Sequence, residues 1–276
     1  MKQIFRTAGS WINILLKIVV MFAVAFPFIW ILSTSLKTYP ETQIFPPKLI
    51  PDSLHWENYK AAYEAMPFLK YLKNSIIVAG SVLVLQYLVI IPAAYGFARG
   101  KFKGKKLLFG IVLLGFMIPQ QITFVPIYLL FSKMNALKSY LPLIVPFIAN
   151  AFGIFLLRQY FMQVPEEIIE AARLDQASSL KIVCKIMIPM AKTPLFTIGL
   201  LSFISNWNSY FWPLIMTNSD DFRTLPIGVA MMTDAEGGRI WNEMMAGNML
   251  LSLPVLVLYL LASKQIRRAF AYSGIK

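Results

Sequence analysis

Four carboxylates lie close together in the stretch EEIIEAARLDQASSLKIVCKIMIP, which runs from Glu166 to Pro189. They are Glu166, Glu167, Glu170 and Asp175, and the whole chain has only 13 acidic residues. Two carboxylates can act as general acid and general base when their environments push their pKa values apart. A short exposed helix offers no apolar pocket that would do this. The stretch therefore predicts a surface for a partner or a solvated loop rather than an active site.

Other reactive groups are scarce in this chain. It has one Cys and one His among 276 residues, so no disulfide can form within it and no zinc or histidine-based catalytic cluster can be assembled. We expect Cys184 to be a small apolar helix residue and His55 to lie in a polar loop. The sequence also lacks the phosphate-binding pattern G-x-x-x-x-G-K-[ST]. The absence of this pattern argues against ATP hydrolysis by this chain alone, and we expect no cofactor in the chain.

The composition indicates a membrane protein. The chain is 58% hydrophobic and 14% charged, with a mean hydropathy of +0.63, whereas soluble domains are about 45–50% apolar and about 25% charged. The apolar residues form long continuous runs instead of alternating, which favours membrane-spanning helices over a β-barrel.

Six apolar segments are long enough to suggest spans, and together they predict one all-α membrane domain over residues 1–276 with no separate soluble domain. Their approximate ranges are 11–32, 75–98, 107–131, 140–157, 195–216 and 246–262. Lys2 and Arg6 precede the first segment, but it is too long for the apolar core of a signal peptide, so a retained signal anchor fits better. The fourth and sixth segments are short and contain proline.

The basic residues predict the orientation of these spans. If the N-terminus is cytoplasmic, the inside segments hold most of the 26 basic residues and few of the acids, and they account for the entire net charge of +13. Such a bias towards cytoplasmic loops is typical of bacterial membrane proteins. It predicts that both termini are cytoplasmic. A nucleic-acid-binding function fits poorly, because the basic residues flank the apolar segments.

This orientation places residues 158–192 in the cytoplasm as a pair of short helices. Pro165 followed by two glutamates is a typical helix start, and Asp175 or Ser178 can cap a second helix over Ser179–Ile188. The small residues Ala171 and Ala172 would let the backbone of another protein come close. In the second helix Leu180, Val183, Ile186 and Met187 can share one face.

The same stretch resembles the EAA loop of inner-membrane permease subunits of binding-protein-dependent ABC importers. That loop reads approximately P-x-E-L-x-E-A-A-x-x-D-G-A-S, followed about a dozen residues later by x-I-x-L-P. The matching residues here are Pro165, Glu167, Ile168, Glu170, Ala171, Ala172, Asp175, Ala177, Ser178, Ile186 and Pro189. Gln176 replaces the glycine of the family, which leaves the geometry of that turn open because glycine would permit a left-handed conformation.

Further segments are similar to the maltose-type carbohydrate subfamily and extend the resemblance over nearly the whole chain. They are STSLKT at Ser33–Thr38, KNSIIVAG, PAAYGFARGKFKGKK, MIPQQITFVPIYLLF, NWNSYFWPL at Asn206–Leu214 and the closing AYSGIK. The resemblance implies the type I importer permease fold with six transmembrane helices, in a bacterial plasma (inner) membrane.

The resemblance also implies partners and a coupling role. The partners would be a homologous second permease subunit, two cytoplasmic ATPase subunits that hold ATP and Mg, and an extracytoplasmic substrate-binding protein. Residues 158–192 would form a coupling loop that docks on the ATPase. The residues implied in docking are Glu167, Glu170, Ala171, Ala172, Arg173, Asp175, Gln176 and Ala177. We also expect the loop from Thr217 to Met245 to contact the binding protein.

Polar residues inside apolar segments are costly and suggest a substrate pathway. The predicted pathway residues are Gln120, Gln121, Asn150, Asn206, Trp207, Asn208 and Tyr210, with Gln86 and Ser209 as further candidates. A sugar would use amides, hydroxyls and an aromatic face. Equally, Gln120 and Gln121 could satisfy carbonyls freed by a kink at Pro119, and Trp207 could be an interface anchor or a packing residue.

The leading functional hypothesis is therefore a permease subunit that imports a sugar or oligosaccharide. An alternative is uptake of glycerol 3-phosphate or another polyol phosphate, since EGGRIWNEMM also resembles such permeases. A self-sufficient carrier or channel would need buried ionisable residues within its spans. The predicted spans contain essentially none beyond Lys17, which lies near the end of the first. A membrane enzyme is disfavoured because no catalytic constellation is visible.

Overall fold

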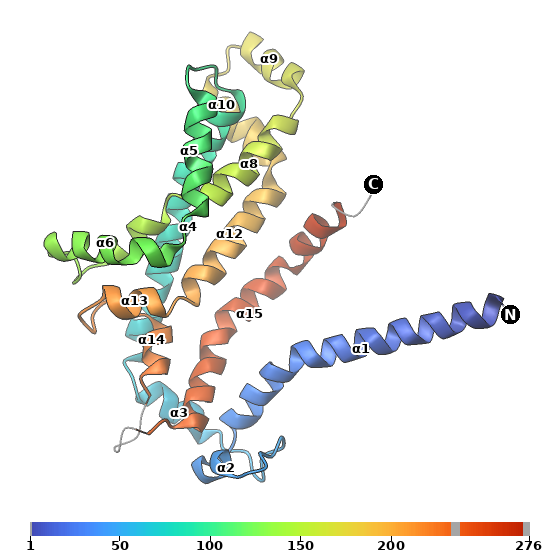
Figure 1. The fold of residues 1–276 in the computed structure, drawn as a ribbon, viewed down its shortest axis with the longest axis vertical. Helices are drawn as coiled ribbons and strands as arrows, with labels where there is room; N and C mark the ends of the chain where they lie inside the picture. Colours follow the sequence, from blue (N-terminus) through green and yellow to red (C-terminus); the bar gives the residue numbers. More distant parts are fainter. Residues whose placement is uncertain (1, 233–237, 273–276) are drawn as a thin grey trace. The chain divides into compact units, whose positions relative to one another are not determined.

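The computed structural model describes residues 2–232 and 238–272, and within these ranges every regular element is a helix (Figure 1). The prediction of an all-α protein is confirmed. By their internal contacts the residues form two compact units. Unit 1 comprises residues 1–68 and 228–254, and unit 2 comprises residues 69–227 and 255–276.

Unit 2 contains most of the helices. They are α4 (Phe68–Arg99), α5 (Lys105–Met117), α6 (Gln120–Lys133), α7 (Leu141–Ile144), a 3-10 turn at Val145–Phe147, α8 (Ala151–Gln163), α9 (Glu166–Leu174), α10 (Ser179–Ile182), a π turn at Val183–Met187, α11 (Ile188–Met190), α12 (Lys192–Trp207) and α13 (Phe211–Met216). The predicted coupling loop corresponds to the end of α8 and the helices α9 to α11.

Unit 1 is built from the two ends of the sequence. It contains α1 (Lys2–Ser35), α2 (Tyr39–Gln43) and α3 (Glu57–Glu64), together with the end of α14 (Leu225–Ala230) and the first part of α15 (Trp241–Tyr272). The side chain of Asn58 in α3 ties this unit together. Its amide donates to the carbonyls of Ser35 and Lys37 at 2.9 and 2.8 Å, and its carbonyl oxygen accepts from Asn242 at 2.9 Å.

Four helices are long and apolar enough to cross a membrane: Asn13–Ser35, Phe68–Arg99, Leu141–Gln163 and Trp241–Leu261. Two further pairs qualify if each bent pair is one span, which gives four to six candidate membrane helices among the described residues. The first pair, α5 and α6, is bent by 95°, and the second, Ser179–Met190 and Lys192–Trp207, by 82°. The predicted segment 107–131 thus lies over two helices, which meet at Ile118 and Pro119.

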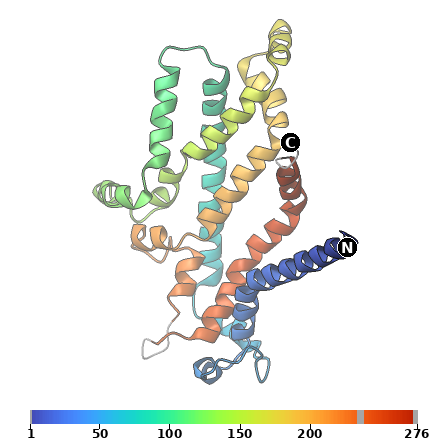
Figure 2. The same ribbon diagram turned by 45° about the vertical axis from the view of Figure 1, so that its right-hand side comes forward.

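The main core of unit 2 lies beneath the coupling loop. It joins Ile90 of α4, Phe161 of α8 and Ile198 of α12 to Ile169 of α9 and Met187 of the π turn. Close approach of the helices is possible because small residues stand at the crossings. A methyl group on Gly153 of α8 would come within 2.7 Å of Cδ1 of Ile90. In both views α9 lies at the end of unit 2 where α4 and α8 finish (Figures 1 and 2).

Candidate functional site: a docking surface and a polar cavity

The turn that ends α9 is closed by backbone hydrogen bonds. The amide of Ala177 donates to the carbonyl of Ala172, and the amide of Gln176 donates to that of Arg173, both at 2.9 Å. This pair of bonds is a Schellman motif, which requires a left-handed residue directly after the helix cap. Gln176 occupies that position with φ of 55°. The departure from the family glycine therefore leaves the turn intact, at the cost of a strained glutamine.

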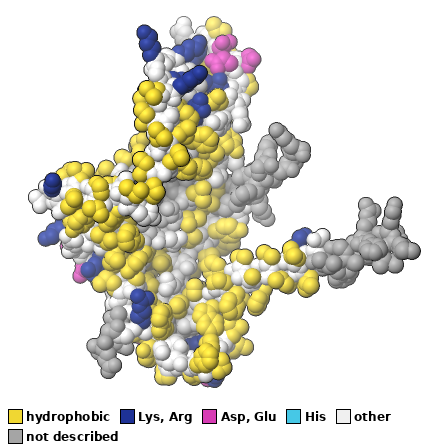
Figure 3. Space-filling model, viewed as in Figure 1, with side chains coloured by type: hydrophobic (Ala, Val, Ile, Leu, Met, Phe, Trp, Pro, Cys, Tyr) yellow, Lys and Arg dark blue, Asp and Glu magenta, His cyan; other side chains and the backbone are white. Residues whose placement is uncertain are grey.

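The outer face of α9 and α10 is open to a partner. Glu167, Glu170, Ala171, Arg173, Asp175 and Gln176 are exposed, whereas Ala172 and Ala177 are partly buried and pack against the core. Ser178 caps α10 by accepting from the amide of Lys181. Charged side chains gather over this end of unit 2, while hydrophobic ones cover the surface along its helices (Figure 3).

Two large apolar residues on this face were missed by the sequence analysis. Leu174 is 85% exposed and Leu180 is 73% exposed. Leu180 was expected to share a face with Val183, Ile186 and Met187, but in the structure it lies outside while Val183 and Met187 are buried. Exposed leucines beside small residues are typical of a surface that binds another protein. We name the face formed by Ala171, Leu174 and Leu180 the docking surface.

Arg99, at the end of α4, anchors the start of the coupling loop. Its side chain is only 11% exposed. Its guanidinium donates to the carbonyl of Phe161 at 3.2 and 2.8 Å, and also to the carbonyl of Val164. The same group pairs with the carboxylate of Glu166 in the first turn of α9. One side chain thus satisfies the last carbonyls of α8 and fixes the position of α9.

A second arginine makes the reciprocal contact. Arg158 of α8 donates to the carbonyl of Phe97 in α4 at 3.0 Å, and its guanidinium lies over the ring of Phe109 at 4.2 Å. Lys105 donates to the carbonyls of Ala98 and Gly100. Cations at the carboxyl ends of helices also interact favourably with the helix dipole. The ends of α4 and α8 are therefore locked together below the docking surface.

A cavity of about 590 Å³ lies further along the same helices. This volume is within the range of small-molecule sites, about 300–1,000 Å³. We name it the polar cavity. Its polar wall consists of Gln86, Gln120, Thr123, Asn150, Ser202, Ser205 and Asn206, and the remaining lining residues are Gly115, Phe116, Ile118, Pro146, Phe147, Ala149, Ala151 and Leu201. None of these side chains carries a charge.

Hydrogen bonds orient the amides of this wall. Gln86 donates to the carbonyl of Phe147 at 2.7 Å, and its own amide oxygen is buried without a partner among the described residues. Asn150 caps α8 by accepting from the amide of Gly153 at 2.9 Å. Asn206 donates to the carbonyl of Ser202 at 2.8 Å. Each amide keeps some hydrogen-bonding capacity for a solute, because an amide has two donors and two lone pairs.

The structure separates the predicted pathway residues into three groups. Gln120, Asn150 and Asn206 line the polar cavity. Gln121 and Tyr210 line a smaller neighbouring cavity of about 240 Å³, in which Gln120 also takes part. Trp207 and Asn208 line neither. The ring of Trp207 is buried and stacks on Phe203 with centroids 5.5 Å apart.

The hydroxyls of Thr123, Ser202 and Ser205 were not among the predicted residues. Their spacing carried a signal, because Ser202 precedes Ser205 by three residues and Asn206 by four, which places it on the same face of α12 as both. Thr123 likewise follows Gln120 by about one turn.

Comparisons with known proteins identify the family and the fold of the chain. Residues 87–271 match the family described as "Binding-protein-dependent transport system inner membrane component". The sn-glycerol-3-phosphate transport system permease protein UgpE of Yersinia pestis is 32% identical over 84% of this chain and 86% of its own length. The probable ABC transporter permease protein YurM of Bacillus subtilis is 30% identical over 96% of this chain and 87% of its own length.

A solved structure has the same fold. It is a chain of a bacterial ABC transporter involved in the import of the acidic polysaccharide alginate, with a TM-score of 0.83, 24% identity, and coverage of 94% of this chain and 96% of that chain. The predicted permease fold is confirmed by this likeness. The chain belongs to the family of inner-membrane components of binding-protein-dependent transport systems, and it is a membrane-embedded ABC importer permease.

Proposed function

We propose that this permease passes a neutral sugar or oligosaccharide across the membrane. The observation that carries the proposal is the polar cavity, whose wall offers amides and hydroxyls and no charged side chain. Hydroxyl groups of a sugar can both donate to and accept from such a wall. Phe116 and Phe147 add apolar surface of the kind that lines most small-molecule sites.

The second candidate substrate is glycerol 3-phosphate or another polyol phosphate, which the name of UgpE favours. A phosphate carries about two negative charges at neutral pH and is usually bound by arginine, lysine or a helix N-terminus. The described lining of the polar cavity offers no arginine or lysine, although the first residues of α6 and α8, Gln120 and Ala151, lie in its wall. The uncharged wall therefore supports the sugar over the phosphate ester.

Energy for transport comes from a separate ATPase in this proposal. The docking surface contacts that subunit, and Glu167, Glu170, Arg173 and Asp175 surround the contact with charges. ATP and Mg are bound by the ATPase, and this chain binds no cofactor. The proposed contact with the ATPase is supported by the exposure of two leucines beside a small residue, next to a helix start that Arg99 holds to the spans.

A homologous second permease subunit completes the membrane part. In the first candidate span, Asn13–Ser35, none of the most apolar window is buried within this chain, although its mean hydropathy is 2.5. A helix that is apolar all round must be covered by lipid or by other spans. We assign part of this cover to the second subunit and the remainder to lipid.

Both termini and the coupling loop lie in the cytoplasm in this proposal, on the basis of the bias in basic residues. Reagent labelling tests it in a Cys184→Ala background. Lys103→Cys should react only from the cytoplasmic side, and Ser219→Cys only from outside. Reaction of both sites from the same side would exclude this orientation.

The loop from Thr217 to Met245 contacts the extracytoplasmic binding protein in this proposal. Its first part is held by Asn74, whose amide donates to the carbonyls of Asp221 and Arg223 at 2.9 and 2.8 Å, and by the ion pair of Lys70 with Asp221. The central part that we expected to protrude includes Asp234, Glu236 and Gly237, which lie outside the described residues. Deletion of 234–238 should weaken stimulation of the ATPase by the loaded binding protein and leave assembly intact.

Uptake into vesicles that contain the complete transporter tests the substrate class. We expect labelled glucose or maltose to enter and sn-glycerol 3-phosphate to be excluded. Asn206→Leu should lower sugar uptake up to about tenfold, as expected for one lost hydrogen bond, while the ATPase stays bound. The matched control is Asn208→Leu, outside both cavities, which should keep full uptake. Uptake of sn-glycerol 3-phosphate alone would establish the second candidate instead.

A further inference from the structure

A second built cavity lies in unit 1, where α1 ends and α15 begins. Its volume is about 220 Å³. It is lined by Trp30, Thr34, Lys37, Glu41, Thr42, Pro47, Trp241 and Met245. We name it the tryptophan cavity. None of these residues lines the polar cavity, and none was singled out by the sequence analysis as a site residue.

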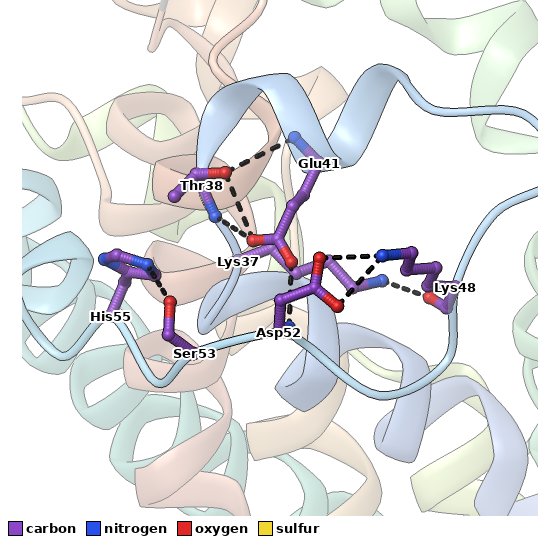
Figure 4. Close-up of polar contacts among 7 residues, drawn as sticks. All are labelled: Lys37, Thr38, Glu41, Lys48, Asp52, Ser53 and His55. Atoms are coloured by element: carbon purple, nitrogen blue, oxygen red, sulfur yellow. Dashed lines mark hydrogen bonds and ion pairs between the residues drawn. The ribbon is translucent and has the colours of Figure 1, made fainter.

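The cation in this cavity is held in place. Lys37 is only 2% exposed. Its ammonium group donates to the carbonyl of Lys48 (Figure 4). The same group lies 4.7 Å from the ring centroid of Trp30. Burial lowers the pKa of Lys37, and the nearby carboxylate of Glu41 acts in the opposite direction. An ammonium group has three donors, so this one can still serve a ligand.

The carboxylate of Glu41, like the ammonium group of Lys37, is held in place by hydrogen bonds. Glu41 accepts from the amides of Asp52 at 2.9 Å and of Thr38 at 2.8 Å, and it forms a capping box with Thr38 at the start of α2 (Figure 4). These backbone hydrogen bonds, first from Asp52 and then from Thr38, lower the pKa of Glu41. Lys37 and Glu41 therefore face the cavity as fixed opposite charges, which together favour a neutral ligand over an anion.

Thr34 points independently to a polar ligand. It is 6% exposed, it lines the cavity, and its hydroxyl oxygen has no hydrogen-bond partner among the described residues. Buried polar groups in native structures almost always have a partner. Because this oxygen has almost no accessible surface, a hydroxyl group of a ligand would supply one only after the Thr34 side chain changes rotamer.

Size and shape narrow the ligand further. A volume of about 220 Å³ would hold roughly seven waters at about 30 Å³ each, which is room for one sugar ring but not for an oligosaccharide. Trp30 and Trp241 provide apolar faces for the carbon side of such a ring, while the threonines, the ammonium group and the carboxylate can bond its hydroxyls.

We propose that the tryptophan cavity binds one neutral sugar ring, at a site separate from the polar cavity of unit 2. The proposal does not require that the same sugar be transported. The ring can come from a free sugar in solution or from the headgroup of a glycolipid, since both present the same hydroxyls.

Fluorine NMR of the complete transporter tests this proposal. The protein is labelled with 5-fluorotryptophan, placed in nanodiscs of phosphatidylethanolamine and phosphatidylglycerol, and titrated with methyl glucoside. The resonances of Trp30 and Trp241, assigned with Trp→Phe variants, should shift, whereas that of Trp212 should not. A second arm uses nanodiscs that contain a glucosyl lipid and no free sugar. Shifts in the first arm identify a solute site, and shifts in the second arm alone identify a lipid site.

Variants of Thr34 connect the shifts to the cavity. Thr34→Val should weaken binding about tenfold, the loss expected from one neutral hydrogen bond. Thr34→Ser should restore it, which separates loss of the hydroxyl from misfolding. The matched control is Thr197→Val, since the hydroxyl of Thr197 bonds the carbonyl of Thr193 in α12, outside the cavity. Absence of shifts in both arms, or shifts produced by inorganic phosphate and not by the sugar, would overturn the proposal.

Discussion

The end of unit 2 that carries the coupling loop, here called the coupling end, and the polar cavity are built in opposite ways. The coupling end presents one contiguous segment, α9 to α11, whose helix start, cap and turn are closed by residues near in sequence. The polar cavity is assembled from side chains of α4, α6, α8 and α12, which stand far apart in the sequence. In the proposed function the first region presents a surface to the ATPase, and the second is a partly open cavity that holds the solute. A contiguous motif suits a surface that must be recognised, whereas a cavity needs walls on several sides.

The largest expected effect comes from Arg99→Leu, which tests whether the two regions are separable. The variant leaves the carbonyls of Phe161 and Val164 without their buried donor, and it leaves Glu166 with only its longer contact to Arg173 at 3.8 Å. We expect a loss of about 3 kcal/mol in the local stability of the coupling loop, seen as faster hydrogen exchange over residues 166–190. Arg99→Lys should recover only part of it, since lysine cannot make the forked contact. Equal loss of protection around Asn206 would mean that the regions form one cooperative unit.

The next effect separates the docking surface from the packing beneath it. Ala171 is exposed, so Ala171→Leu should disturb only a partner, at about 1–3 kcal/mol of ATPase affinity. Ala172 packs against the core, so Ala172→Leu should also perturb the loop itself. Binding of the purified ATPase measures the first effect, and hydrogen exchange of the isolated permease measures the second. Full ATPase binding and full uptake by Ala171→Leu would remove the docking role.

A smaller and opposite effect is expected at the turn. Gln176→Gly removes the cost of a left-handed conformation in a residue with a side chain, about 1–2 kcal/mol, and should slow hydrogen exchange around Ala177. Asn135, with φ of 53° at the end of α6, is the matched control. Asparagine tolerates this conformation better than glutamine, so Asn135→Gly should gain less. An equal or larger gain at Asn135 would contradict the account of the turn.

The smallest effect is expected for Glu170→Gln. The structure gives Glu170 no ion-pair partner among the described residues, so its charge can act only on the ATPase. An exposed pair contributes roughly 0–1 kcal/mol and is screened by salt. Binding of the ATPase should fall slightly at low ionic strength and not at high ionic strength. A loss that persists in high salt would indicate a buried contact instead.

The sequence predicted the coupling end better than the cavity, for physical reasons. A helix start, a cap and a pair of small residues are local features, and they are legible between Pro165 and Ser178. The role of Arg99 was not predicted, because its partners lie more than sixty residues away. The buried position of Ala172 and the exposure of Leu180 depend on packing against α4 and α8, which no local pattern encodes.

The bends were the least predictable part of the fold. The run from 107 to 131 was predicted as one span, with a kink at Pro119 as one possibility, yet it turns by 95° between Met117 and Gln120. This turn places Gln120 and Thr123 in the wall of the polar cavity. Proline was visible in the sequence, but proline can also be accommodated in a continuous span, as Pro92 is in α4.

Three helices each carry one residue that lines the polar cavity and one that holds the coupling loop or packs in the core beneath it. These pairs are Gln86 and Arg99 on α4, the cap Asn150 and Phe161 on α8, and Asn206 and Leu195 on α12. At about 1.5 Å per residue, Gln86 and Arg99 are roughly 20 Å apart along the axis. Each of these helices can thus act as a lever. A tilt of about 10° about the end that holds Arg99 would displace Gln86 by about 3.5 Å, enough to break a hydrogen bond such as that from Gln86 to Phe147. A movement that begins at the coupling loop would therefore reach the wall of the polar cavity through the helices themselves.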